Sequence, residues 1–353
     1  MTPKQRVLES LTIGGKPDCT AAGPFTGYYA AGHAGIPLGK YVRNGRLIAE
    51  AQLRLQEDLC HDILITAADT YYIAEAFGLD IEMYPGALPT ARRALFSDLA
   101  ETRRLKVPDP GSAGRMPVYL EAVRHLKEMA GDDLAIRGTG TGPFSLAAYL
   151  FGIDNFMLKL MDIESGEAPE SDAKDMRNLL ELMTETTLRF VTAQAELGAD
   201  ILYVGDSLAS LNMISPQMYR NWVHPYHQRI FTALKERMQP GRQFSMIHMC
   251  GNNMDILADM ISTGVDLIEI DAAMNLTAVS GISHNRVALI GNIDPVKVLN
   301  NGSVTDVGKA CNEAVRQGVG NGRFILGSGC FVCPGTPFEN LQALVSSAHN
   351  WGG

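Results

Sequence analysis

Three side chains that suit a metal ion stand where two short apolar segments end. His248 and Cys250 are two residues apart in segment 243–250, and Cys330 closes segment 323–330. Residues two apart in an extended strand project from the same face, so His248 and Cys250 should point the same way. One imidazole and two thiolates make a three-ligand zinc set with a fourth position open. Such a zinc ion would activate a bound thiol or alcohol, or polarise an ether oxygen, by its charge.

Other interpretations of the cysteines stay open. A buried free cysteine also serves as a small apolar residue, and His-x-Cys alone is a weak signal. Cys330 and Cys333 match the C-x-x-C spacing of redox pairs, but Pro334 and Pro337 delay the helix that such a pair requires. Cys333 could instead be a spare ligand or a structural thiol. Three further cysteines have no partner at ligand spacing and are interpreted as filler: Cys19, Cys60 and Cys311.

Acidic side chains end other segments of the same kind. Asp69 ends segment 62–69, and Asp206 and Asp271 stand one residue before the ends of segments 201–207 and 267–272. Each could act as a general base, hold His248 by a hydrogen bond, or be a polar group at the edge of the fold. We expect one of the three, and not all, to act directly in the reaction.

Two further motifs are interpreted as structural. The stretch 138–142, Gly-Thr-Gly-Thr-Gly, resembles a phosphate loop but has neither the G-x-G-x-x-G spacing nor a Walker motif, so a tight turn is preferred. His224 and His227 fall on a predicted helix near its surface. For both histidines a solvated or capping role is favoured over metal binding.

Eight short apolar segments supply the strands that would position these side chains. Most are continuously apolar, which is typical of parallel strands buried on both faces. The segments are residues 17–24, 62–69, 134–142, 201–207, 243–250, 267–272, 287–294 and 323–330. Between them lie amphipathic segments of helical period, among them residues 46–59, 117–129, 173–197, 216–236, 254–263 and 304–317.

Eight strand–helix repeats predict an α/β protein with a (β/α)8 TIM barrel, whose active site lies at the carboxyl ends of the strands. The 353 residues exceed the ~250 typical of that fold. We therefore expect one domain over residues 1–353 with an insertion at about 78–131, between the second and third strands. A doubly wound open sheet is the alternative, but no segment reads as an edge strand.

Composition and charge exclude several classes of protein. The chain has 30 basic and 39 acidic side chains, a net charge of −9, which disfavours nucleic-acid binding. No apolar run reaches the roughly 18–20 residues that span a bilayer, and the N-terminus lacks a signal-peptide core. Six cysteines are too few for a disulfide framework. A cytoplasmic protein with free thiols and no membrane association is expected.

Several segments resemble the uroporphyrinogen decarboxylase superfamily, whose members are (β/α)8 barrels. They are residues 142–149, 214–219, 225–226, 291–295 and 334–340. Asp69 and Tyr149 match the catalytic aspartate and tyrosine of the decarboxylases. Residues 25–35, however, lack the arginines with which decarboxylases bind substrate carboxylates, and Cys330 replaces a decarboxylase histidine. An octacarboxylate substrate would then carry unpaired charges, which makes decarboxylation the weaker interpretation.

The corrinoid-dependent methyltransferases of that superfamily are similar to this chain at the positions where the decarboxylases differ. In that branch the residues matching His248, Cys250 and Cys330 bind a catalytic zinc ion, and 205–210 fits its acidic turn. The resemblance implies a zinc-dependent methyltransferase that exchanges a methyl group between a small molecule and the cobalamin of a separate corrinoid protein. The small molecule would be a methoxylated donor, as in O-demethylases, or a thiol acceptor such as coenzyme M.

The resemblance does not fix the direction of methyl transfer or the oligomeric state. Residues 23–84 do not closely resemble the coenzyme M enzymes, which favours the demethylating direction. Asp206 or Asp271 would orient His248 or a substrate group, and a homodimer is compatible with the sequence. No D-x-H-x-x-G signature is present, so cobalamin is expected on the partner. The alternatives are a uroporphyrinogen decarboxylase-like lyase and a non-catalytic barrel that holds a corrinoid or tetrapyrrole.

Overall fold

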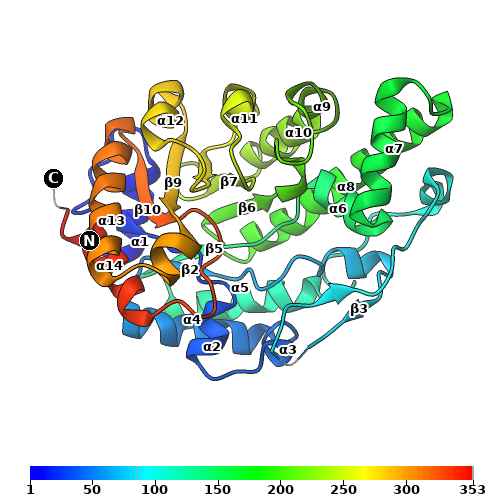
Figure 1. Cartoon of the computed structure of the whole chain (residues 1–353). Coiled ribbons are helices and arrows are strands. Elements are labelled where there is room, and N and C mark those ends of the chain that lie inside the picture. Colours follow the sequence, from blue (N-terminus) through cyan, green and yellow to red (C-terminus); the bar gives the residue numbers. More distant parts are fainter. Residues whose placement is uncertain (85, 352–353) are drawn as a thin grey trace.

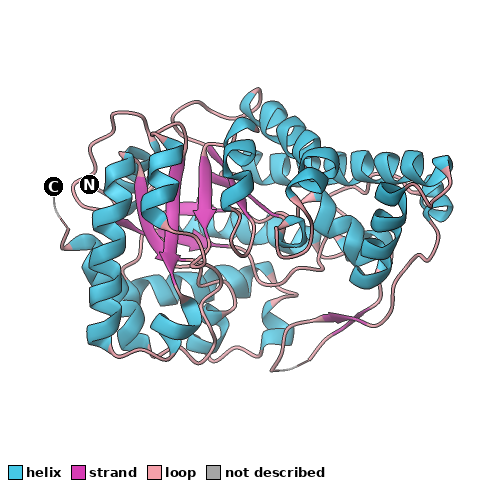
Figure 2. Cartoon of the chain, turned by 45° about the horizontal axis from the view of Figure 1, so that its top comes forward, coloured by secondary structure: helices cyan, strands magenta, loops and turns pink. Residues whose placement is uncertain are grey.

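The computed structural model describes residues 1–84 and 86–351, and eight parallel strands form its centre (Figures 1 and 2). In order of pairing, they are β1 (Ala21–Ala22), β10 (Phe324–Ser328), β9 (Ala288–Ile293), β8 (Leu267–Ile270), β7 (Phe244–His248), β6 (Ile201–Gly205), β5 (Ala135–Arg137) and β2 (Ile63–Ile65). The two ends of this order meet, because the Asp62 N–H donates to the Ala22 carbonyl at 2.9 Å. The predicted (β/α)8 barrel is confirmed, and the open-sheet alternative is wrong.

Helices surround the strands (Figure 2). The longer ones are α4 (Gly45–Leu59), α5 (Met116–Ala130), α7 (Ile153–Ser165), α8 (Glu170–Glu196), α10 (His224–Lys235), α13 (Val304–Gly318) and α14 (Phe338–His349). Shorter ones are α2 (Tyr29–His33), α3 (Leu38–Tyr41), α6 (Pro143–Phe151), α9 (Pro216–Trp222), α11 (Leu257–Ser262) and α12 (Leu276–Ser283). Single tight turns are η1 (Ala74–Phe77), η2 (Leu99–Arg104), η3 (Ser207–Ala209), η4 (Met254–Ile256), the π-helical η5 (Pro295–Asn300) and η6 (Val319–Asn321).

The helix predicted over residues 216–236 is two helices, α9 and α10, separated at Val223. Pro225 explains the break, because proline lacks an N–H and its ring clashes with the carbonyl of the preceding turn. It is tolerated in the first turn of α10, where no such bond is required. The prediction of one continuous helix was therefore wrong at this position.

Helix α1 (Pro3–Leu11) closes the amino end of the barrel and was not among the predicted helices. Thr2 caps it by accepting a hydrogen bond from the Gln5 N–H, while the Gln5 side chain bonds back to the Thr2 N–H. This capping box is readable in the sequence as Thr-Pro-x-Gln. Val7 and Leu11 are fully buried in the cluster of side chains that fills the barrel.

The segment between β2 and α5 contains most of the irregular structure on the way to the third barrel strand. A short antiparallel pair, β3 (Ile81–Glu82) and β4 (Thr90–Ala91), is followed by η2. Figure 1 shows β3 away from the barrel strands. Helix α5, which ends the predicted insertion 78–131, packs against α4 in the surrounding helical layer. The irregular part of the predicted insertion therefore stops before α5.

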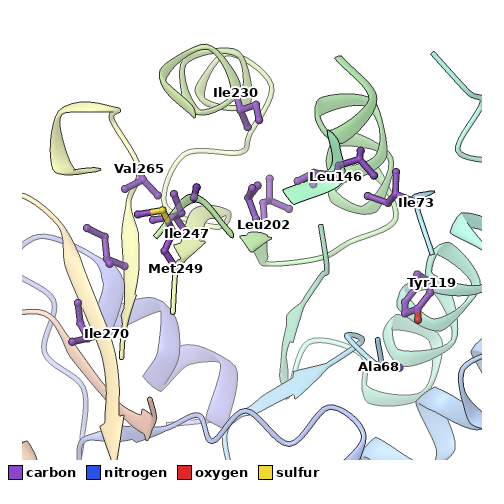
Figure 3. Close-up of a cluster of buried hydrophobic side chains, with 14 of the residues drawn as sticks. Ala68, Ile73, Tyr119, Leu146, Leu202, Ile230, Ile247, Met249, Val265 and Ile270 are labelled. Atoms are coloured by element: carbon purple, nitrogen blue, oxygen red, sulfur yellow. The ribbon is translucent and has the colours of Figure 1, made fainter. Parts of the chain in front are cut away.

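Alternate residues along each strand face two different cores. Leu202, Ile247 and Ile270 face outward into the layer between strands and helices (Figure 3). Met246, one residue before Ile247, faces inward with the side chains that fill the barrel. By the same period of two, His248 lies on the inner face, at the carboxyl end of β7.

No single helix in the described part of the chain is long and apolar enough to cross a membrane. Helices α6 and α7 meet the length and composition requirement only when taken together, and they are bent by 110° relative to one another.

Candidate metal centre at the barrel mouth

The three predicted metal ligands converge at the carboxyl ends of the strands. His248 ends β7, Cys250 follows two residues later, and Cys330 comes two residues after β10. His248 Nε2 lies 3.3 Å from Cys250 Sγ, which lies 4.0 Å from Cys330 Sγ. All three potential ligand atoms are within 4.8 Å of one another. Cys333, also considered as a ligand, is not part of this set.

These separations suit a tetrahedral zinc ion. Zn–S bonds of about 2.3 Å and a Zn–N bond of about 2.0 Å place two sulfur ligands about 3.8 Å apart, and a sulfur about 3.5 Å from a nitrogen. The sulfur–sulfur distance of 4.0 Å and the nitrogen–sulfur distance of 3.3 Å agree with this within a few tenths of an ångström. Two soft thiolates and one imidazole also match the ligand preference of zinc.

The electrostatics of the set favour a thiolate at Cys250. Its Sγ accepts a hydrogen bond from the Cys330 thiol, which lowers the pKa of Cys250; burial opposes this, and the nearby His248 imidazole lowers the pKa further. The same hydrogen bond raises the pKa of Cys330. Burial lowers the pKa of His248, but the Glu269 carboxylate and Cys250 outweigh burial and raise it to about 9. Metal ligation requires all three groups to be deprotonated.

A carboxylate stands behind His248. Glu269, on the neighbouring strand β8 and paired in register with His248, has its Oε2 3.2 Å from His248 Nδ1. The orientation is not that of a hydrogen bond, and Nδ1 is otherwise without a partner. A metal-bound histidine commonly donates its second ring nitrogen to such a carboxylate, which fixes the tautomer of the ring. Glu269 was not selected from the sequence, where Asp206 or Asp271 was expected in this role.

Glu269 is fixed by a buried arginine. Arg137, from β5, donates to the two carboxylate oxygens at 2.9 and 3.2 Å, and both side chains are at most 1% exposed. The guanidinium lies between two rings, 3.9 Å from the centre of Phe25 and 4.0 Å from that of Tyr203. Charged residues inside two otherwise apolar strands were the sequence signal for this pair.

Ser207 is the second contact that the sequence did not single out. Its Oγ lies 3.2 Å from Cys250 Sγ, and it begins η3 directly after the fourth barrel strand. A hydroxyl in this position can donate to the Cys250 thiolate. Ser207 thus stabilises the charged form of a candidate ligand.

A cavity of about 180 Å³ opens against the three candidate ligands. Its wall is mainly aromatic and hydroxyl-bearing, and includes Phe25, Thr70, Tyr72, Thr139, Thr141, Tyr149, Tyr203 and Phe331. Tyr149 and Asp69, the two residues that match decarboxylase catalytic positions, both lie on this wall. Burial raises the pKa of Tyr149, so its phenol keeps its proton at neutral pH.

The Asp69 carboxylate is already engaged. It accepts hydrogen bonds from two guanidinium nitrogens of Arg115, from the Tyr119 hydroxyl at 2.7 Å and from the Tyr71 N–H at 2.9 Å. Arg115 also pairs with Glu75. In this arrangement Asp69 anchors the mouth of the barrel, and most of its hydrogen-bonding capacity is used by Arg115, Tyr119 and the Tyr71 N–H.

Asp206 points away from the metal ligands. Its fully buried carboxylate accepts bonds from the Phe144 and Ser145 N–H groups at the start of α6 and lies 2.9 Å from His227 Nε2. It therefore occupies the helix N-terminus that a phosphate would need, and the glycine stretch before α6 is not a phosphate loop. The surface role expected for His227 was wrong, because its ring is completely buried against Asp206.

The two remaining predicted residues are Asp271 and His224. Asp271 accepts bonds from the Gly251 and Ala273 N–H groups, both at 2.8 Å, and so holds the turn that follows Cys250. His224 is partly exposed and lies 2.8 Å from Ser262 Oγ. Among the described residues, the carboxylate against His248 is that of Glu269; the contacts of Asp206 and Asp271 lie elsewhere.

Comparison with known proteins places this site in a family. A family model described as uroporphyrinogen decarboxylase (URO-D) matches residues 5–351. The methylcobamide:CoM methyltransferase MtbA of Methanosarcina acetivorans is 32% identical over 281 residues, which are 79% of this chain and 76% of the relative. The uroporphyrinogen decarboxylase of Thermus thermophilus is 28% identical over 311 residues, 87% and 85% of the two chains.

A solved structure shares the fold. It is a methyltransferase from Methanosarcina mazei that superposes with a TM-score of 0.86 over 99% of both chains, at 24% identity. The sequence match is stronger to the methyltransferase relative MtbA, at 32% identity, than to the decarboxylase, at 28%. The chain therefore belongs to the uroporphyrinogen decarboxylase family, and within that family it is a methyltransferase of the corrinoid-dependent kind.

Proposed function

We propose that this chain is a zinc-dependent methyltransferase that transfers a methyl group between the cobalamin of a partner corrinoid protein and a small thiol. One observation carries the proposal: the His248, Cys250 and Cys330 donor atoms converge within 4.8 Å on the wall of a cavity at the barrel mouth. Three protein ligands beside a substrate-sized space are typical of catalytic rather than structural zinc.

The choice of a thiol is supported by the relatives. MtbA, at 32% identity, is named for a reaction with coenzyme M. The sequence of residues 23–84 favoured demethylation of a methoxylated compound instead, and that direction stays a prediction. Both reactions would use the same cavity and the same ligands, so one assay can compare them.

The residues of this chain would have two kinds of role, metal binding and positioning of the ligands. His248, Cys250 and Cys330 would hold the metal, which when bound supplies positive charge to stabilise a thiolate. Glu269 would orient the His248 ring, and Asp271 would hold the turn after Cys250. In the thiol direction an S–C bond forms as the Co–C bond of the methylated corrinoid breaks. The electron pair of the broken bond stays on cobalt, and the thiol proton passes to solvent.

A spectroscopic assay tests the proposal. The zinc-loaded chain is mixed with methylcobalamin, as a free substitute for the partner's corrinoid, and with a thiol; the reverse assay uses cob(I)alamin and methoxyarenes. We expect methyl transfer that stops when a chelator removes zinc and returns when zinc is added. Transfer that survives complete zinc removal would contradict the role of zinc. No transfer in either direction, with conversion of uroporphyrinogen to coproporphyrinogen, would establish the lyase instead.

A further inference from the structure

We infer that the substrate enters the cavity without a formal charge apart from its reacting sulfur, and that a small hydroxyl-bearing thiol fits better than a sulfonated or a quaternary-ammonium thiol. This inference rests on the proposed function, because it concerns the same cavity. It assigns a substrate class that differs from the sulfonated thiol in the name of the relative MtbA.

Apart from the candidate metal ligand His248, the described lining of the cavity has no basic side chain to pair with an anion. Among the residues that the structure describes, no lysine or arginine side chain lines it. The two thiolates of Cys250 and Cys330 would neutralise a zinc ion, and a bound substrate thiolate would add one more negative charge. A sulfonate in the same small space would add a second negative charge with no cation beside it, which is costly in a poorly hydrated site.

The nearest guanidinium groups are already paired. Arg137 makes two hydrogen bonds to Glu269 and is 1% exposed. Arg115 binds both Asp69 and Glu75. Neither group can turn toward a substrate anion without leaving a buried carboxylate unpaired, and that penalty works against recruitment of either arginine.

The aromatic wall is equally unsuited to a cation. A quaternary ammonium needs free ring faces, but one face of Phe25 lies against the Arg137 guanidinium and Phe331 stacks on the ring at 3.7 Å. Tyr203 also gives a face to Arg137, at 4.0 Å. Two rings of the wall, Phe25 and Tyr203, therefore each have a face that the Arg137 guanidinium already occupies.

Size and polarity point to a small neutral molecule. The volume of about 180 Å³ corresponds to about six water molecules. The hydroxyl groups of Thr70, Thr141 and Tyr149 on the wall can donate to or accept from a neutral polar group. A two-carbon thiol that ends in a hydroxyl satisfies both conditions.

Three thiols that differ only in their end group test the inference. 2-Mercaptoethanol, 2-mercaptoethanesulfonate and thiocholine share the HS–CH2–CH2 unit but end in a hydroxyl, a sulfonate and a trimethylammonium group. Binding to the full-length chain loaded with Co2+ is followed by the rise of the thiolate-to-cobalt absorption band, which is independent of turnover. We expect 2-mercaptoethanol to bind at least about 10-fold more tightly than either charged thiol, a difference of about 1.4 kcal/mol.

A charge added at the rim should change this preference. Thr70 is exposed at the mouth and lines the cavity, so Thr70→Lys should shift the ratio of sulfonate to hydroxyl binding toward the sulfonate by about 10-fold. Thr277→Lys, outside the lining of this cavity, is the matched control and should leave the ratio unchanged.

The outcomes separate the two proposals. Equal or tighter binding of the sulfonate or of thiocholine by the unmodified chain would overturn the inference, as would a band that rises with none of the three thiols. Methyl transfer that is fastest with 2-mercaptoethanesulfonate would overturn the inference while supporting the proposed function. Preferential binding of 2-mercaptoethanol without any methyl transfer would support the inference about the cavity and count against the proposed function.

Discussion

The two ends of the barrel both bury charged and polar groups, but they pair them differently. At the amino end, covered by α1, the fully buried Asp62 carboxylate contacts Arg6 at 2.6 Å, the Ala22 N–H at 2.7 Å and His349 at 2.9 Å. At the carboxyl end, the donor atoms of His248, Cys250 and Cys330 converge within 4.8 Å, and the His248 imidazole lies beside the Cys250 sulfur.

Three aspartates at the amino end of the barrel make the same kind of hydrogen bond. Asp62, Asp200 and Asp266 each stand one residue before a strand and accept a hydrogen bond from the backbone N–H of a neighbouring strand, at Ala22, Ile136 and Ser245. Lys4, from α1, pairs with Asp200 at 2.7 Å. These carboxylates fasten strands to one another and to α1, so their effect is on stability.

Structural and functional polar groups in such a barrel differ in how their charge is compensated. A carboxylate with several donors has its charge compensated within the chain, as Asp62, Asp69 and Asp206 do. Two cysteine sulfurs that converge beside a single imidazole have less charge compensation, and they gain most from an added cation. Position at the strand ends alone, which the sequence provides, does not distinguish the two cases.

The largest effect is expected from removing a thiolate at the mouth. Cys250→Ser and Cys330→Ser should each lose bound zinc and lower the rate of methyl transfer by more than about 100-fold. This exceeds the roughly 10–100-fold loss that follows mutation of a residue that only contacts a metal ligand. Metal analysis and the methylcobalamin assay measure both effects. Cys60→Ser, at an exposed position, is the control. A Cys330 variant with full zinc content and full activity would contradict the functional role of the polar groups at the carboxyl end of the barrel.

At the amino end the expected effect is on folding. Asp62→Ala leaves the buried Ala22 N–H without its partner and removes one of the two carboxylates that pair with Arg6, the other being Asp18, and should lower the free energy of unfolding by about 1–3 kcal/mol. Urea unfolding measures this change. Zinc content per folded molecule should stay the same, and a parallel loss of zinc would mean that the two ends are not independent.

The amino end should also be sensitive to pH. Burial lowers the pKa of His61 to about 4, and its two ring nitrogens have no hydrogen-bond partner among the residues that the structure describes. The unfolded chain, with a His61 pKa near 6.5, binds the proton more tightly. The contribution of His61 is therefore complete above about pH 6.5 and falls as the pH drops toward 4, by up to about 3 kcal/mol.

Urea unfolding at a series of pH values checks this prediction. His61→Phe should flatten the pH dependence of stability between pH 6.5 and 4 relative to the unmodified chain. An unchanged slope in this variant would assign the dependence to other groups.

A smaller effect is expected behind the metal ligands. Glu269→Gln keeps the size of the side chain but weakens its hold on the His248 ring, and should reduce zinc affinity by about 10–100-fold. Competition with a metal indicator measures the affinity. Asp266→Asn, a carboxylate just before the same strand but at the amino end, should leave zinc affinity unchanged. Equal losses in both variants would indicate a general effect of β8 on the site.

The sequence predicted the eight strands and the convergence of His248, Cys250 and Cys330, because strands and strand ends follow from local pattern. Apolar runs mark buried strands, and the period of two places His248 and Cys250 on one face. The partners of the aspartates could not be read in the same way, since Asp206 meets His227 only after α10 packs on the barrel. The period of two and the position near a strand end do not single out Glu269, rather than Asp206 or Asp271, as the carboxylate that contacts His248.

Two unpredicted features, the Arg137–Glu269 pair and helix α1, are nevertheless indicated by local sequence patterns. Arg137 and Glu269 interrupt apolar strands with opposite charges, which indicates a buried pair even before the strands are placed in order. The capping box at Thr2 predicts α1. The contact of Ser207 with Cys250 carried no such signal, because it depends on the path of the turn after β6.

X-ray absorption spectroscopy identifies the atoms that bind the zinc ion. X-ray absorption of the zinc-loaded chain should show two sulfur ligands at about 2.3 Å and nitrogen or oxygen ligands at about 2.0 Å, and a third sulfur when 2-mercaptoethanol is added. This result would place Cys250, Cys330 and the substrate on one ion. A zinc ion with no sulfur ligands, or a sulfur count that does not change with thiol, would contradict the account.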